Sequence, residues 1–335
     1  MLVRIDASGI CHSDISLCDG SMPGPMPVVL GHEGAGTIVG VGASVSSLRP
    51  GDRVVLAAVA PCDACTACRR GQPFLCAEVR SQSPPSFVDG GRPLRGASGL
   101  GTLSDLLVVD ERAAIRVETD LSPVELAVIG CAVLTGAGSV MNIAQTREGD
   151  DVLIVGAGGI GLAAVLAARC LGARSVVAVD PCDSARAVAV ECGATLAVDP
   201  SSPDAESTML DVTGGRGFDA AFECAGRSSA FDLAWRLTRR GGDVVAIGVP
   251  PGNVPVPLML ADIPLSGRRL SGCVYGSSVV RRDIPMYVRL AEQHRLDLAK
   301  LVGRVISVDD APAVILAGGG GVGRTVVTTI PPDES

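Results

Sequence analysis

The chain has 335 residues, which is enough for two domains with separate cores. Hydrophobic residues make up 47% of it and aromatic residues only 2%, so a core has to be built from Ala, Val, Leu, Ile and Gly. The formal net charge of −8, without a basic block, argues against nucleic acid or an anionic membrane as a partner. Residues 1–6 alternate like a strand and do not resemble a signal peptide, so we expect a cytoplasmic protein.

The first part of the chain, up to about residue 132, predicts an irregular, mainly β domain. It is rich in Gly, Pro and Val, and turn residues separate its short apolar runs. The expected strands are residues 28–30, 36–41, 53–56 and 106–109.

From about residue 149, strand-like and helix-like runs alternate, which indicates a parallel sheet with helices on both faces. The expected strands are 152–155, 175–180, 195–198, 218–223, 243–248 and 269–274. The expected helices are 160–171, 183–191, 204–212 and 228–239, followed by a late helix over about 281–295 and a last strand over 324–330. Residues 152–168 carry no charge and approach the length of a membrane span, but their glycines favour a strand, a turn and a helix.

A glycine-rich turn follows the first of these strands. It reads Gly156-Ala157-Gly158-Gly159-Ile160-Gly161 and leads into an Ala- and Leu-rich run. Gly156 permits a tight turn, Gly158 lets the backbone approach a pyrophosphate, and Gly161 allows close packing of helix on strand. The pyrophosphate is expected at the helix N-terminus, where unpaired N–H groups favour anions. Such a pattern is weak alone, but its place between strand and helix predicts a dinucleotide site.

Asp180 ends the next strand, 19 residues after Gly161. Its carboxylate is suited to accept both hydroxyls of an adenosine ribose and repels a 2′-phosphate, so NAD is favoured over NADP. Arg186 is near enough in sequence to weaken this preference. The alternative is that Asp180 is an ordinary residue at a strand end.

Four cysteines form a cluster, Cys62-x2-Cys65-x2-Cys68-x7-Cys76, in a segment rich in turn residues. Four thiolates at this spacing suit a tetrahedral Zn²⁺ with no open position, which is a structural site. An iron–sulfur cluster is the main competitor, while free core cysteines and disulfides are two further interpretations.

A second group of candidate ligands lies in the β domain. Cys11 and His32 stand beside Asp14 and Glu33, in a chain with only three histidines. The spacing of Cys11 and His32 alone only suggests a metal site. For Cys131, a buried free cysteine is the default interpretation.

Several motifs occur together in a characteristic order. They are Cys11-His12-Ser13-Asp14, Gly31-His32-Glu33-Gly34-Ala35-Gly36, Pro50-Gly51-Asp52-Arg53-Val54, the four-cysteine loop, Gly130-Cys131 with Thr135-Gly136, and the glycine fingerprint. In this combination the chain resembles the zinc-dependent medium-chain alcohol dehydrogenase family over nearly its whole length. The resemblance implies an α/β protein, with a GroES-like catalytic domain at residues 1–134, completed by 275–335, and a Rossmann doubly wound parallel sheet at 135–274 that binds NAD.

The resemblance also implies roles for individual residues. The catalytic zinc ligands are matched by Cys11, His32 and Cys131. Glu33 matches a carboxylate that approaches the metal transiently. Asp14 matches the carboxylate that orients the histidine ligand. Ser13 matches the hydroxyl residue that takes the proton of the alcohol. The remaining matches are to the cofactor: His12 and Arg324 at the pyrophosphate, and Thr135, Ile247, Gly248, Val249 and Tyr275 at the nicotinamide, besides Gly156, Gly158, Gly159, Ile160, Gly161 and Asp180.

We therefore expect an NAD-dependent zinc alcohol dehydrogenase with two zinc ions per chain, acting on a primary, aromatic or medium-chain alcohol. A homodimer or homotetramer is expected, with no nucleic-acid or membrane partner. One alternative is a formaldehyde dehydrogenase of the same family that acts on a thiol adduct. Another, of a different class, is a catalytically inactive nucleotide- and zinc-binding protein.

Three features depart from the family. The sequence begins within the strand that leads to the first zinc ligand, so we expect an uncovered edge in the β domain, low turnover or poor solubility. Ser16 occupies the position of a frequent proton-relay histidine, which leaves Ser13, the ribose and water for proton release. Ala58 stands where a bulky pocket residue is common, and it predicts an open substrate pocket.

Overall fold

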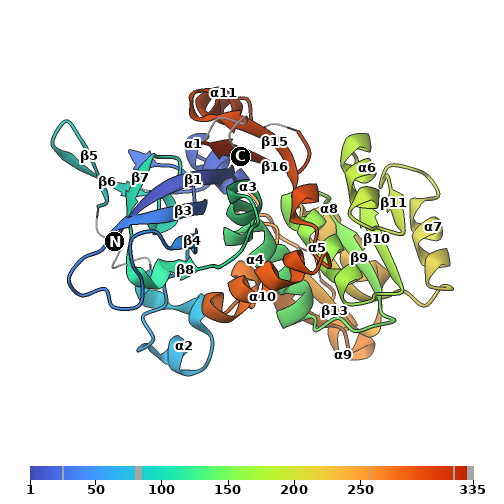
Figure 1. The fold of residues 1–335 in the computed structure, drawn as a ribbon. Coiled ribbons are helices and arrows are strands. Elements are labelled where there is room, and N and C mark those ends of the chain that lie inside the picture. The colour runs from blue at the N-terminus through green and yellow to red at the C-terminus, as the bar shows by residue number, and fades with distance from the viewer. Residues whose placement is uncertain (25, 80–84, 257, 320, 330–335) are drawn as a thin grey trace. The chain divides into compact units, whose positions relative to one another are not determined.

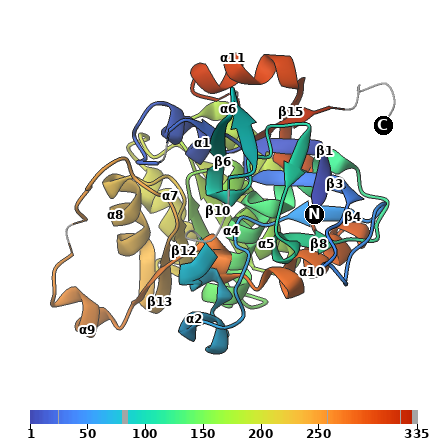
Figure 2. The ribbon, with the colours of Figure 1, turned by 90° about the vertical axis from the view of Figure 1, so that its left-hand side faces the viewer.

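The computed structural model describes residues 1–24, 26–79, 85–256, 258–319 and 321–329. The chain divides into two compact units, which are described separately. Unit 1 is Met1–Leu134 with Ser278–Ser335, and unit 2 is Thr135–Ser277. Their elements can be followed in Figures 1 and 2.

Unit 1 is built on a seven-stranded sheet in the order β15-β16-β1-β3-β4-β8, with β7 paired to β1. The strands are β1 (Leu2–Ile10), β3 (Glu33–Gly40), β4 (Arg53–Leu56), β7 (Leu106–Val108), β8 (Ala114–Arg116), β15 (Val302–Ser307) and β16 (Arg324–Thr328). A second, three-stranded sheet has the order β2-β6-β5. Its strands are β2 (Val28–Val29), β5 (Phe87–Asp89) and β6 (Arg92–Gly96). The last residue of the strand expected over 324–330 lies outside the described residues.

The first strand is not at an edge of this sheet. Along one side, β1 pairs with β3. Along the other side, its first residues pair with β7 and its last residues with β16. Side chains that alternate along β1, such as Val3 and Ile5, are fully buried with Ile38. β1 is therefore an interior strand of this sheet, because segments distant in sequence supply both of its neighbours.

The helices of unit 1 are mostly short. They are α1 (His12–Cys18), α2 (Thr66–Arg69), α3 (Pro123–Ala127), α10 (Val280–Glu292) and α11 (Ala311–Leu316), and α4 (Ala132–Gly138) crosses into unit 2. The sequence did not predict α3 and α4, because residues 126–140 are buried on all sides and show no helical periodicity. Among the described residues, no single helix is long and apolar enough to cross a membrane. The two helices Pro123–Gly130 and Ala132–Ile143 together have the length and apolar composition of a membrane span, but they are bent relative to each other.

Unit 2 has a six-stranded, wholly parallel sheet in the order β11-β10-β9-β12-β13-β14. Its strands are β9 (Asp151–Val155), β10 (Ser175–Val179), β11 (Leu196–Val198), β12 (Phe218–Glu223), β13 (Thr238–Ala246) and β14 (Arg269–Gly272). Its helices are α5 (Gly159–Cys170), α6 (Asp183–Glu191), α7 (Ala205–Val212), α8 (Ser228–Leu237) and α9 (Asp262–Ser266). The predicted fold class is confirmed.

One boundary in unit 2 was predicted wrongly. Residues 238 and 239 were expected to end a helix, but β13 begins at Thr238, which pairs with Phe218. The polar run Arg239-Arg240-Gly241-Gly242 gave no sign of a strand, and these residues lie in an irregularity of the register between Thr238 and Asp243, the residues that pair with β12.

The strand order of unit 2 reverses between β9 and β12. From β9 the chain adds β10 and β11 on one side, then returns to add β12, β13 and β14 on the other. Ligands of such sheets bind at the carboxyl ends of the strands beside this reversal. The glycine-rich turn that follows β9 lies there.

Candidate active site and metal centres

Four ligand-type side chains converge in unit 1. Cys11 caps α1 directly after β1, His32 and Glu33 stand at the start of β3, and Cys131 lies between Gly130 and α4. One donor atom from each lies within 4.8 Å of the others, and all four residues are buried. Antiparallel pairing sets this meeting, because Gly9 of β1 is opposite Glu33 of β3. We call these four residues the first metal set.

Asp14 is fully buried and fixes the histidine of this set. Its Oδ1 lies 3.3 Å from His32 Nδ1 and also accepts the backbone N–H of Gly31 at 2.9 Å. Its Oδ2 accepts the backbone N–H of Cys11 at 3.0 Å. With Nδ1 held by a carboxylate, Nε2 is the nitrogen left for a metal.

Ser13 is the hydroxyl next to the first metal set. Its Oγ donates to Cys11 Sγ at 3.2 Å and lies 3.5 Å from His32 Nε2. Ser16, one turn later in α1, is half-buried, and His12 is exposed at the first position of the helix. The fold thus brings the Ser13 hydroxyl to the ligands and leaves the His12 side chain exposed.

Arg324, the first residue of β16, is buried beside the set. Its Nη2 lies 2.9 Å from Glu33 Oε1 and 3.5 Å from Cys11 Sγ. The resemblance implied a cofactor contact for Arg324 but not this pairing. Sequence reasoning also missed Gly9, whose position opposite Glu33 no local signal reveals.

The ionisable groups of the set shift one another's pKa values. The hydrogen bond with Cys131 holds the pKa of Cys11 well below its ordinary value, while the same bond raises the pKa of Cys131. Burial raises the pKa of Glu33 to about 8, although Arg324 opposes this. Two soft thiol donors, one imidazole and one carboxylate are a donor set that zinc prefers, and binding releases the proton of Cys131.

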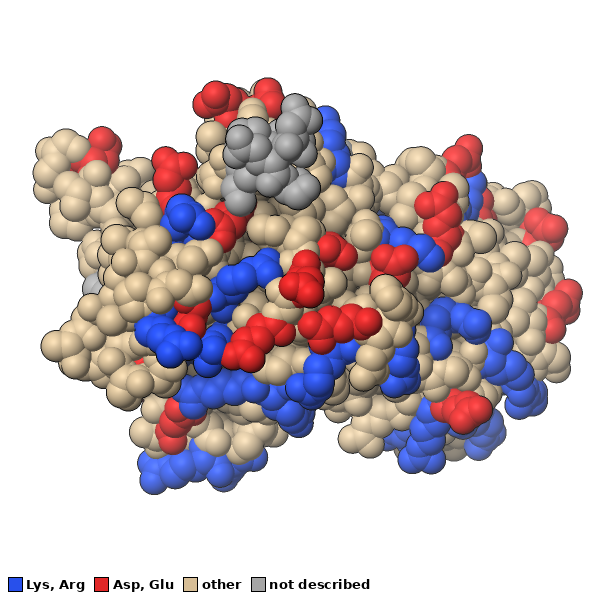
Figure 3. Space-filling view, viewed as in Figure 1, with Lys and Arg blue, Asp and Glu red and all other residues tan. Residues whose placement is uncertain are grey.

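The four-cysteine loop forms a second set in unit 1. All four Sγ atoms lie within 4.8 Å of one another, and the pairs Cys62–Cys68 and Cys65–Cys76 are each 3.9 Å apart. Thiolates about 2.3 Å from a tetrahedral zinc are roughly 3.8 Å apart, so the spacing fits one ion. Backbone N–H groups point at the sulfurs, as from Cys65 to Cys62 at 3.2 Å. Basic side chains gather over α2, which ends at Arg69, and offset the negative charge of four thiolates (Figure 3).

A cavity of about 210 Å³ lies beside this loop. Ala57, Ala58, Leu100, Arg112 and Cys62 are among its lining residues, whereas Cys11, His32 and Cys131 are not. The small side chain of Ala58 thus borders an open space, and that space adjoins the four-cysteine loop.

In unit 2 the glycine fingerprint has the geometry of a nucleotide-binding turn. Gly156 has a φ of 102°, which disfavours other residues, and α5 begins at Gly159 with Gly158 as its N-cap. A Cβ on Gly161 would lie 1.9 Å from the carbonyl oxygen of Gly156, so only glycine allows α5 this close to the turn. Ile160 lies in the first turn of α5.

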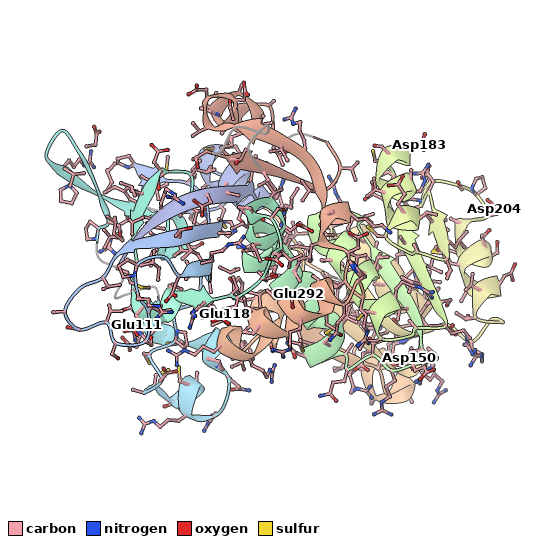
Figure 4. All side chains as sticks on the ribbon, in the orientation of Figure 1. Glu111, Glu118, Asp150, Asp183, Asp204 and Glu292 are labelled. Carbon is pink, nitrogen blue, oxygen red and sulfur yellow. The ribbon has the colours of Figure 1, made fainter. Side chains whose placement is uncertain are left out.

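Asp180 follows β10 and belongs to the same turn region. Its Oδ2 accepts the backbone N–H of Ala157 at 2.8 Å, and its Oδ1 accepts that of Cys182 at 2.9 Å. Arg186 donates to the Asp180 carbonyl oxygen at 2.7 Å and pairs with Asp183, the first residue of α6 (Figure 4). The Arg186 guanidinium is therefore already paired with Asp183 and with the Asp180 carbonyl oxygen. The carboxylate of Asp180 remains the charged group next to the glycine-rich turn.

The predicted nicotinamide residues occupy different environments within unit 2. Thr135 and Ile247 are buried, Val249 is largely exposed, and Tyr275 has a positive φ of 53°. A Cβ on Gly248 would lie 2.0 Å from the backbone nitrogen of Gly226, so this position requires glycine. Glu223 holds the adjoining turn, since its Oε1 accepts the N–H groups of Ala225 and Gly226 at 2.8 and 2.7 Å.

Comparison with known proteins decides the family. A profile described as an alcohol dehydrogenase GroES-like domain matches residues 1–119, and one described as a zinc-binding dehydrogenase matches residues 159–293. Geraniol dehydrogenase of Castellaniella defragrans is 36% identical over 309 residues, which cover 88% of this chain and 80% of that protein. The chain belongs to the zinc-dependent medium-chain alcohol dehydrogenase family.

Other family members agree with this assignment. S-(hydroxymethyl)glutathione dehydrogenase of Photobacterium damsela subsp. piscicida is 34% identical over 92% of this chain and 86% of that protein. The crystal structure of benzyl alcohol dehydrogenase from Acinetobacter calcoaceticus has a TM-score of 0.90 and 29% identity, covering 98% of this chain and 91% of that one. As a family member, the chain is an NAD-dependent zinc enzyme that oxidises and reduces alcohols and carbonyl compounds, and its cofactors are Zn²⁺ and NAD.

Proposed function

We propose that the first metal set is the catalytic centre, with Cys11, His32 and Cys131 as zinc ligands and Glu33 as a carboxylate beside them. The observation that carries this assignment is the convergence of two thiols, one imidazole and one carboxylate within 4.8 Å in unit 1. Three protein ligands leave a fourth position for substrate, which is typical of catalytic zinc. Unit 1 is then the catalytic domain and unit 2 the NAD-binding domain. The sequence placed the second boundary between residues 274 and 275, whereas the two units divide between Ser277 and Ser278.

The chain's own residues supply positioning and proton transfer. Zinc held there supplies Lewis acidity towards an alcohol oxygen, and NAD is the hydride acceptor. Asp14 holds His32 in one tautomer, which keeps Nε2 directed at the site. Ser13 takes the alcohol proton, since its hydroxyl is 3.5 Å from His32 Nε2 and next to Cys11. Ser16 offers no basic group to accept the proton that the Ser13 hydroxyl would give up in turn.

We propose that the four-cysteine loop holds a second, structural zinc, so that each chain carries two. A closed set of four thiolates leaves no position for substrate. The 3.9 Å separation of its sulfurs supports a single ion, because a multi-iron cluster holds its thiolates farther apart.

We propose that the cofactor is bound through its pyrophosphate at Gly156–Gly161 of unit 2. Asp180 is the ribose acceptor and selects NAD over NADP. This selection is supported by the engagement of Arg186 with Asp183 and with the Asp180 carbonyl.

The proposed substrates are primary alcohols, aromatic or of medium chain length. The similarity to a geraniol dehydrogenase and a benzyl alcohol dehydrogenase supports this class. A thiol adduct of formaldehyde is the second candidate, because of the similarity to S-(hydroxymethyl)glutathione dehydrogenases. An inactive protein is not favoured, because the whole ligand set is present.

A panel of substrates with NAD tests the proposal. NADH formation should be fastest, by kcat/KM, with an aromatic or medium-chain primary alcohol. A higher kcat/KM with S-(hydroxymethyl)glutathione would transfer the assignment to the second candidate. A zinc-loaded protein that binds NAD but forms no NADH from any of these substrates would contradict both.

We propose that the chain forms a homodimer through the β14 edge of unit 2. Among the described residues, β14 pairs on one side only, with β13. Apolar side chains around it are exposed, among them Met259, Leu260, Leu265 and Leu270, and α9 lies at the periphery of unit 2 (Figure 2). An unpaired strand edge with exposed apolar residues is suited to pair with a second copy.

We also propose a cytoplasmic location. All twelve cysteines are free thiols, and the two metal sets require reduced sulfur. A reducing compartment keeps such thiols available.

A further inference from the structure

A buried pair of hydroxyl groups lies close to the first metal set in unit 1. Thr102 belongs to loop 100–105, directly before β7, and only 1% of its surface is exposed. Its Oγ1 lies 2.7 Å from Oγ of Ser8, which is equally buried and stands in β1 three positions before Cys11. The pair therefore ties the end of the strand that leads to Cys11 to a loop distant in sequence.

The same loop holds the backbone directly before His32. The carbonyl oxygen of Gly31 accepts the N–H groups of Gly101 and Thr102, each at 3.0 Å. The N–H of Gly31 is accepted by Asp14 at 2.9 Å. Gly31 has a φ of 93°, and a Cβ there would lie 2.6 Å from Thr102 Oγ1. Gly31 is thus fixed at its N–H and at its carbonyl, and so is the direction in which the chain enters His32.

The methyl group of Thr102 packs on the other side of His32, against β3. A Cβ on Gly34 would lie 2.7 Å from Thr102 Cγ2, so the methyl group fills the space that a side chain at residue 34 would need. Gly34 is also the partner of Ser8 in the β1–β3 register. The methyl group of Thr102 therefore contributes packing on β3, while its hydroxyl contributes a bond to β1.

We propose that the hydroxyl pair of Ser8 and Thr102 sets the distance between Cys11 and His32, because it ties the end of β1 to the loop that fixes Gly31. Both are positioning residues, and neither supplies a ligand atom. Ligands that are already held at the distances a metal requires bind it more tightly than ligands that it has to draw together. The inference rests on the proposed assignment of the first metal set as the catalytic centre.

Two substitutions of Thr102 separate positioning from packing. Thr102→Val keeps the shape of the side chain and loses the hydroxyl, whereas Thr102→Ser keeps the hydroxyl and loses the methyl group. With Co²⁺ at the first metal set and zinc in the four-cysteine loop, Thr102→Val should change the visible absorption spectrum. It should also lower the affinity for Co²⁺, measured by competition with a chelator, roughly tenfold. Thr102→Ser should keep the wild-type spectrum and affinity and lower only the melting temperature.

Ser8→Ala tests the pair from its other member. It should reproduce the spectrum and affinity of Thr102→Val, and the double variant should add little, because both changes remove the same hydrogen bond. Thr37→Val is the matched control, since the hydroxyl of Thr37 on β3 donates to Asp6 on β1 at 2.7 Å. It removes a bond of the same kind between the same strands, and it should leave the Co²⁺ spectrum and affinity unchanged.

A wild-type spectrum and affinity in Thr102→Val would overturn the inference. Equal losses in Thr102→Val and Thr102→Ser would also overturn it, because the effect would then come from packing, and so would an equal loss in Thr37→Val. If Thr102→Val does not fold, Ser8→Ala decides by the same criteria. Failure of the proposed function is distinguishable, because the wild-type chain would then hold no metal at the first metal set or form no NADH.

Discussion

The carboxylate of Asp14 lies 3.3 Å from Nδ1 of His32, and its two oxygens also accept the backbone N–H groups of Gly31 and Cys11. The Cys11 N–H, which lies between β1 and α1, and the Gly31 N–H and His32 Nδ1, which lie just before β3, therefore share one buried carboxylate. Asp14 joins the first metal set to the backbone that positions it.

Asp14→Asn should weaken zinc binding at the first metal set by about 10- to 100-fold. An amide offers one acceptor oxygen in place of two, so at least one buried N–H loses its partner. Competition with a chromophoric chelator measures the affinity. Asp19→Asn, which changes an exposed carboxylate at the end of α1, is the control. Equal affinities in both variants would argue against the orienting role of Asp14.

Cys65→Ser should lower the zinc content from two ions per chain to one and reduce the melting temperature, because a closed thiolate set contributes folding free energy. His32→Ala should also lose one zinc and abolish turnover, but with little effect on the melting temperature. Metal analysis and thermal unfolding provide the two readouts. Cys18→Ser, at an exposed cysteine outside both sets, should retain two zinc ions. One zinc or none in wild type would contradict the assignment.

Asp180→Ser should raise the KM for NAD roughly tenfold and narrow the preference for NAD over NADP, because an ionic ribose acceptor and a repulsive charge disappear together. Steady-state kinetics with both cofactors measure this. Asp204→Asn, at an exposed position before α7 (Figure 4), should leave both constants unchanged. If wild type prefers NADP and Arg186→Ala removes that preference, then Arg186 and not Asp180 sets the selectivity.

Glu223→Gln should stabilise unit 2 increasingly as the pH rises. Burial raises the pKa of Glu223, although backbone N–H groups oppose the shift. Because the pKa of Glu223 is higher in the folded than in the unfolded protein, the protonated side chain favours the folded state. This contribution to the free energy of unfolding is complete below the unfolded-state pKa of about 4.5, and it is lost as the pH rises through the folded-state pKa. Glutamine carries no charge and keeps an acceptor for Ala225 and Gly226. Melting temperatures at about pH 5 and pH 8 should show a larger gain at the higher pH; a gain independent of pH would refute this explanation.

Leu265→Glu should convert the homodimer into monomers, because it places a charge among the exposed apolar residues beside β14. Sedimentation equilibrium measures the mass. Leu316→Glu is a matched control, since Leu316 is 82% exposed in α11 of unit 1 and Leu265 is 69% exposed. If the wild type is a monomer, or if Leu265→Glu remains a dimer, the β14 edge is not the interface between subunits.

The sequence by itself determined the features that depend on local spacing. The turn at Gly156–Gly161, the alternating elements of unit 2 and the four-cysteine loop are each written within a few residues, because turns, periodicity and chelation by one loop are local effects. The cluster of Cys62, Cys65, Cys68 and Cys76 needed no tertiary information to be recognised as a metal site.

Only the tertiary structure decided what depends on pairing between distant segments. The local sequence around Cys131 indicated no more than a buried free cysteine. The register of β1 on β3 and the position of α4 bring it close to Cys11 and His32. The neighbours of β1, the buried partnership of Arg324 with Glu33 and the hydroxyl pair of Ser8 and Thr102 have the same origin. Strand register joins residues that no sequence window contains, because it is fixed by burial of a whole sheet face and not by local preference.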